Sequence, residues 1–119
     1  MTTGVRAAAL AAFVVSGLQP ALADDPFLGR WAVDPAGCRA GGDTASTTPM
    51  TVTATSVKWF VAFCTIKKSY RIGDSLALQA RCSSEGQVKV IPIGLKLSGK
   101  DRVKVTWDKA PAGEMRRCK

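Results

Sequence analysis

Residues 69–107 read SYRIGDSLALQARCSSEGQVKVIPIGLKLSGKDRVKVTW, and this stretch decides the fold class. Apolar and polar side chains alternate over Ser75–Cys82 and again over Arg102–Trp107. Turn residues separate the runs at Gly73-Asp74, Ser83–Gly86 and Ser98–Asp101. Alternation with a period of two is typical of β-strands, and short Gly- and Asp-containing loops favour hairpins. The stretch therefore predicts consecutive antiparallel strands.

Similar runs continue the pattern toward both ends of the chain. We expect further strands at Gly29–Val33, Met50–Ala54, Val57–Phe63, Ile66–Ile72, Gln87–Leu97 and Glu114–Cys118. The chain shows no long helical period. It is therefore predicted to be all-β, a small antiparallel meander of about 7–8 strands that forms a barrel or a sandwich.

The phase of the alternation predicts which side chains form the core. The core candidates are Trp59, Val61 and Phe63, then Leu76, Leu78, Ala80 and Cys82, and then Val103, Val105 and Trp107. In the run from Gln87, the apolar residues Val88 and Val90 are even-numbered, whereas Ile91, Ile93, Leu95 and Leu97 are odd-numbered. We therefore expect a β-bulge or bend around Val90–Pro92.

The first residues have the pattern of a secretory signal peptide. Arg6 precedes an apolar run from Ala7 to Leu18, which is too short to span a bilayer, and Ala21-Leu22-Ala23 resembles a cleavage site. We expect residues 1–23 to be removed and residues 24–119 to form a single β domain. A retained N-terminal anchor is the alternative. The expected location is the periplasm or the extracellular space.

Four cysteines, Cys38, Cys64, Cys82 and Cys118, remain in the exported chain. An even number in an oxidising compartment predicts two disulfides. A metal site is the competing interpretation, but no two cysteines have the short spacing of zinc ligands and the sequence contains no His. Because Cys38 and Cys64 follow the expected first and third strands, we expect the pairs Cys38–Cys64 and Cys82–Cys118.

The chain is strongly basic, with a formal net charge of +8, of which Arg6 contributes one unit. Such a chain is attracted to anionic surfaces. The polar phase of the strands places a basic stripe on the outside of the sheet, made of Lys67, Arg71, Arg81, Lys96, Arg102 and Lys104. We expect Lys96, Arg102 and Lys104 to lie close together, exposed to solvent. An ordinary solvated face is the alternative interpretation of this stripe.

The residues needed for common catalytic sites are missing. Without His there is no Ser-His-Asp or Cys-His site, and paired cysteines leave no thiolate nucleophile. The carboxylates Asp74, Glu85, Asp101 and Asp108 are scattered over turns and strand ends, and no glycine-rich phosphate loop occurs. The sequence predicts neither an enzyme nor a cofactor.

The element FLGRWAVDP, with Gly29 two residues before Trp31, resembles the start of lipocalin- and avidin-type barrels, including the periplasmic metalloprotease inhibitors. The resemblance implies that Trp31 plugs one end of a barrel and that Gly29 lets a neighbouring segment approach. The segments GRWAVDPAGC, WFVAFC and RRC also resemble small exported bacterial proteins of unassigned function.

Two functions fit these features. The first is a secreted, non-catalytic binding module, for instance an inhibitor of an extracytoplasmic protein, which reaches its partner with the long polar loop Asp34–Pro49. The second is a basic protein that adheres to anionic polymers or lipids of the cell envelope. A small-ligand carrier is disfavoured, because large side chains are expected to fill the interior. No specific nucleic-acid partner and no membrane-spanning segment are expected in the mature chain.

Overall fold

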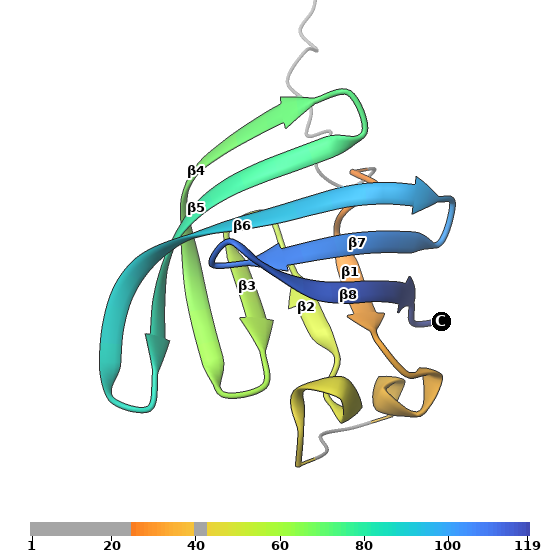
Figure 1. Cartoon of the computed structure of the whole chain (residues 1–119), viewed down its shortest axis with the longest axis horizontal. Coiled ribbons are helices and arrows are strands. Elements are labelled where there is room, and N and C mark those ends of the chain that lie inside the picture. The colour runs from red at the N-terminus through yellow and green to blue at the C-terminus, as the bar shows by residue number, and fades with distance from the viewer. Residues whose placement is uncertain (1–24, 40–42) are drawn as a thin grey trace, which may run out of the picture.

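The structure, a computed structural model, describes residues 25–39 and 43–119, so the predicted signal peptide lies outside the described residues. Eight antiparallel strands close into a barrel in which β8 pairs back with β1 (Figure 1). They are β1 (Gly29–Ala32), β2 (Met50–Val52), β3 (Ser56–Trp59), β4 (Ala62–Ile72), β5 (Ser75–Ser84), β6 (Gln87–Gly99), β7 (Arg102–Trp107) and β8 (Ala110–Arg117). The predicted all-β meander is confirmed, and it forms a barrel.

The barrel interior is filled by side chains from every strand. Met50, Ile93, Leu95 and Met115 are among the largest fully buried side chains. The period-two expectation is confirmed for β5 and β7, where Leu78, Ala80 and Cys82, and Val103 and Val105, are buried in the core. The packing thus agrees with the prediction of a filled interior. It gives no support to the hypothesis that the barrel carries a small ligand.

One end of the barrel is closed around Trp31, which is completely buried. Its indole N–H donates to the carbonyl oxygen of Phe27, and the guanidinium of Arg117 lies over its ring, 4.3 Å from the centroid. Arg117 also donates to the carbonyl oxygens of Pro26 and Leu28. Gly29 has a φ of +127°, and a Cβ there would lie 3.3 Å from Nη1 of Arg117. The lack of a side chain at Gly29 therefore lets Arg117 reach this end.

The opposite end carries two half-buried tryptophans and the long loop. Trp59 and Trp107 make an edge-to-face contact with ring centroids 5.3 Å apart. The indole N–H of Trp59 lies within hydrogen-bonding distance of the carbonyl oxygens of Ala45 and Thr48. Ala45 is the first residue of the short 3₁₀ helix η4 (Ala45–Thr47), and Thr48 directly follows this helix. The loop Asp34–Pro49 is thus anchored to the barrel near its C-terminal end.

The boundary between the third and fourth strands was predicted wrongly. The turn falls at Phe60-Val61, because Trp59 pairs with Ala62 at the end of the β3–β4 ladder. Neither turn residue is a typical turn former, so the sequence carried no signal there. As a result Phe63 faces outward and is 53% exposed, Val61 is 49% exposed, and the expected core face of Trp59, Val61 and Phe63 does not exist.

The cysteines form two disulfides, as predicted, but the expected pairing is wrong. The bonds are Cys38–Cys118 and Cys64–Cys82. Because β4 begins at Ala62, Cys64 lies within it and directly opposite Cys82 of β5. Cys118 follows β8, and barrel closure brings β8 beside β1 and the segment that holds Cys38.

The predicted bulge at Val90–Pro92 is also wrong. The β5–β6 ladder runs through this segment without a register shift, and the odd-numbered residues of β6 stay on the inner phase. Val88 and Val90 lie on the outer face, more than half exposed. A register shift occurs instead between Ile66 and Lys68 in β4, which makes Lys67 the extra residue and reverses the phase of the strand beyond it.

Candidate anion-binding groove

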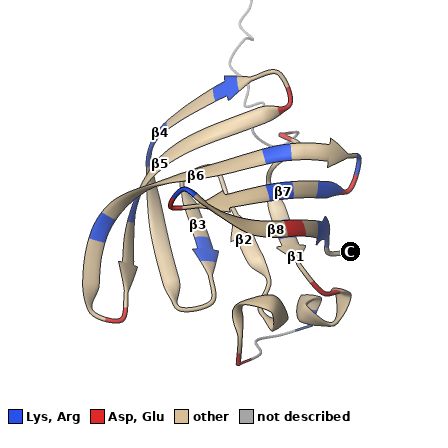
Figure 2. Ribbon diagram, in the orientation of Figure 1, with Lys and Arg blue, Asp and Glu red and all other residues tan. Residues whose placement is uncertain are grey.

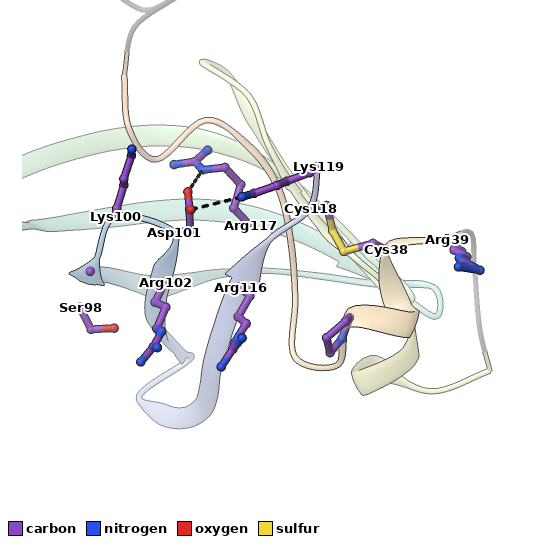
Figure 3. Close-up of a pocket in the computed structure, with 12 residues that line it drawn as sticks. Cys38, Arg39, Ser98, Lys100, Asp101, Arg102, Arg116, Arg117, Cys118 and Lys119 are labelled. Atoms are coloured by element: carbon purple, nitrogen blue, oxygen red, sulfur yellow. Dashed lines mark ion pairs between the residues drawn. A yellow bond between two sulfur atoms is a disulfide. The ribbon is translucent and has the colours of Figure 1, made fainter.

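An open groove of about 930 Å³ lies between the 3₁₀ helix η3 (Pro35–Cys38) and the β6–β7 turn (Figure 3). Its remaining lining comes from the neighbouring ends of β7 and β8 and from the C-terminal residues. The lining residues are Pro35, Cys38, Arg39, Ser98, Gly99, Lys100, Asp101, Arg102, Arg116, Arg117, Cys118 and Lys119. The groove exists only because barrel closure joins segments that are far apart in the chain.

The η3 side of the groove is fixed by covalent and polar contacts. The disulfide joins Cys38 to Cys118, and the backbone N–H of Cys118 donates to the carbonyl oxygen of Arg30 at 2.8 Å. The guanidinium of Arg30 donates to the carbonyl oxygen of Cys38. The Asp34 side chain caps η3 by accepting a hydrogen bond from the backbone N–H of Ala36. These contacts pre-organise the η3 side of the groove.

The groove is strongly cationic. Six basic side chains line it against one carboxylate, that of Asp101. Oδ1 of Asp101 is 3.4 Å from Nε of Arg117, and Oδ2 of Asp101 is 3.6 Å from Nζ of Lys119. The other four cations are Arg39, Lys100, Arg102 and Arg116, and their side chains have no hydrogen bond or ion pair within the described part of the chain. The local charge is therefore only partly compensated.

Arg102 and Arg116 stand directly opposite each other in the β7–β8 ladder. Their side chains extend side by side from the two strands (Figure 3). Like charges in directly opposed positions destabilise a sheet. Two residues further along the same ladder, by contrast, Lys104 is opposite the acidic Glu114. The arginine pair lacks such a partner. An anion placed between the two guanidinium groups would offset their mutual repulsion.

The structure brings together half of the predicted basic stripe. Lys96 is directly opposite Lys104 on the outside of the β6–β7 ladder, and Arg102 lies two residues from Lys104 on the same face. All three are exposed, as predicted. Figure 2 shows basic positions, in blue, on the neighbouring strands β6 and β7. Of the three, only Arg102 lines the groove.

The other half of the stripe lies elsewhere. Arg81 is opposite Val90, six residues or about 20 Å along β6 from Lys96, and Lys67 is the bulged residue of β4. Arg71 is not part of an outer stripe. Because the bulge reverses the phase, Arg71 pairs with Leu76 on the inner phase, lies 5.1 Å from the Phe27 ring centroid and binds Asp25 at 2.6 Å.

Sequence reasoning missed most of the groove residues. Arg39 follows η3, Lys100 lies in the β6–β7 turn, and the other three, Arg116, Arg117 and Lys119, lie at the end of β8 or just beyond it. The basic cluster around Cys118 was the one available signal, since Arg116, Arg117 and Lys119 flank this cysteine in the sequence. Its proximity to the β6–β7 turn requires knowledge of the strand pairing.

Comparison with protein-family models, with curated proteins and with solved structures shows no match to this chain. The resemblance of the Gly29–Trp31 element to lipocalin- and avidin-type barrels therefore stays a prediction. The two disulfides are compatible with an oxidising, extracytoplasmic compartment. Within residues 25–39 and 43–119, no helix is long and apolar enough to cross a membrane.

Proposed function

We propose that this protein is a non-catalytic binding module of the extracytoplasmic space that binds an anionic partner in the groove beside Cys38–Cys118. The observation that carries the proposal is the pair Arg102 and Arg116, opposed across β7 and β8 without an acidic partner. The partner class is a polyanion of the cell envelope or an acidic protein surface. The non-catalytic part is supported by the sequence, which has no His, and by the four cysteines, which are all paired.

The chemistry of the arginine pair favours phosphate or carboxylate groups. Each guanidinium is planar and offers several N–H donors, so it can bind the two oxygens of such a group simultaneously. Arg39 and Lys100 stand at the edges of the groove and extend the cationic surface beyond one anionic group. This extension favours a partner with repeated negative charges over a single small anion.

The double substitution Arg102→Gln and Arg116→Gln tests the proposal. Both residues are exposed, so we expect the fold to change in stability by less than about 0.5 kcal/mol per site. Affinity for heparin, a soluble polyanion used as the probe, should fall at least about tenfold at ~0.1 M salt. The slope of log affinity against log salt concentration should decrease by roughly two. Isothermal titration across a salt series measures both quantities.

The matched control is Lys67→Gln with Arg81→Gln, which removes the same charge from β4 and β5. We expect it to weaken binding much less than the groove variant. Equal losses in the two double variants would mean that net charge, not the groove, holds the polyanion. Heparin binding that neither variant weakens would instead direct attention to the loop Asp34–Pro49 and to an inhibitor-type interaction.

A further inference from the structure

The turn between β3 and β4 presents apolar side chains at an exposed hairpin tip. Phe60 is 41% exposed and Val61 is 49% exposed. Phe60 also has a φ of +54°, in the left-handed region that Gly, Asn and Asp adopt most easily. A bulky aromatic residue at this position is costly for the backbone, and 41% of it still stays exposed. The tip therefore has a feature that folding alone does not explain.

The outer face behind the tip is also apolar. Phe63 on β4 is opposite Ser83 on β5, and Ser83 is opposite Val88 on β6. In the next outward row, Arg81 is opposite Val90. Phe63, Val88 and Val90 are each more than half exposed. Only the small Ser83 and the long, flexible Arg81 stand on β5 between these side chains. The apolar side chains therefore form a patch over β4, β5 and β6.

Unpaired cations accompany this patch. Lys58 is directly opposite Phe63, and Arg81 lies beside Val90. Neither side chain has an ion pair with any described residue. The two cross-strand rows, from β3 to β6, contain no acidic residue, and Glu85 stands beyond them in the β5–β6 turn. Exposed apolar groups flanked by free positive charges complement an anionic lipid surface, which offers both phosphates and hydrocarbon.

We propose that this region docks onto the surface of an anionic lipid bilayer. We call it the tip surface, and it consists of Phe60, Val61, Phe63, Val88 and Val90 with Lys58 and Arg81. Phe60 and Val61 enter the boundary between headgroups and acyl chains. Lys58 is two residues, or about 7 Å, behind Phe60 along the strand, so its ammonium group reaches the headgroup phosphates. This membrane contact is separate from the groove and goes beyond the proposed function.

Co-sedimentation with vesicles tests the proposal, using the oxidised protein and mixed phosphatidylglycerol–phosphatidylcholine vesicles. The test variant is Phe60→Asn with Val61→Thr. Asn tolerates a positive φ, and Thr keeps the β-branched shape of Val, so the hairpin is retained. We expect affinity for the anionic vesicles to fall at least about tenfold. The native protein should bind pure phosphatidylcholine vesicles far more weakly than the anionic ones.

Two controls separate this surface from other causes. Ile72, which is 73% exposed at the far end of β4, provides an apolar control, and Ile72→Thr should bind the vesicles as the native protein does. The groove variant Arg102→Gln with Arg116→Gln should also keep vesicle binding while it loses heparin. The proposal is overturned if the tip variant binds anionic vesicles normally, if the groove variant alone loses them, or if the native protein does not sediment with them.

Discussion

Replacing Trp31 by alanine is expected to lower the free energy of unfolding by about 3–5 kcal/mol, the range typical of a large aromatic residue deleted from a core. Trp31 is fully buried, so the substitution leaves a cavity. It also removes the donor to the carbonyl oxygen of Phe27 and the ring that lies against the guanidinium of Arg117. Three stabilising contributions disappear together at the same barrel end.

Denaturant unfolding under oxidising conditions measures this effect. Trp107→Phe is the matched control, because Trp107 is half-buried at the opposite end and keeps an aromatic ring after substitution. We expect the control to lose clearly less stability than Trp31→Ala. A loss below about 1 kcal/mol for Trp31→Ala would contradict the assignment of Trp31 as the anchor of this end.

Removal of the Cys38–Cys118 disulfide is the second large expected effect. The bond joins residues separated by 80 positions, and the chain-entropy relation gives about 4.5 kcal/mol for a loop of that length. The double substitution Cys38→Ser with Cys118→Ser should therefore lower the free energy of unfolding by about 4 kcal/mol. It should also weaken heparin binding, because η3 loses its covalent link to β8.

The second disulfide provides the control for this prediction. Cys64 and Cys82 are only 18 positions apart, which corresponds to about 3 kcal/mol in the same relation. Cys64→Ala with Cys82→Ala should also destabilise the protein, but heparin affinity should stay near the native value because the groove does not include this pair. Equal heparin affinities for both disulfide variants, measured where both are folded, would show that Cys38–Cys118 does not organise the groove.

The fold was predictable where alternation and turn residues agree. Over β5 and β7 the side chains alternate regularly between core and solvent, and Gly73-Asp74 marks the turn before β5. The prediction failed where a local signal was missing. The Phe60-Val61 turn contains no turn-forming residue, and an undetected shift there moved Cys64 out of its true strand and produced the wrong disulfide pairing.

The candidate site was less predictable than the fold, because it depends on contacts between distant segments. Arg102 was identified from its outward phase on β7. Its partner Arg116 was in a strand predicted too short, since β8 begins at Ala110 and not at Glu114. The approach of η3 and the C-terminal residues follows from closure of β1 on β8, which a meander pattern alone does not specify. A single bulged residue, Lys67, was enough to place Arg71 on the wrong face.

Anion binding in the groove is tested by a nuclear magnetic resonance titration that observes the arginine side-chain Nε–Hε groups while a short polyphosphate is added. The groove account predicts the largest shift changes at Arg102 and Arg116, accompanied by backbone changes at the neighbouring ends of β7 and β8. Arg81, which lies on a separate part of the barrel, should change little. Shifts at Arg81 as large as those at Arg102 and Arg116, or no shift at the pair, would contradict the claim that the groove is the anion site.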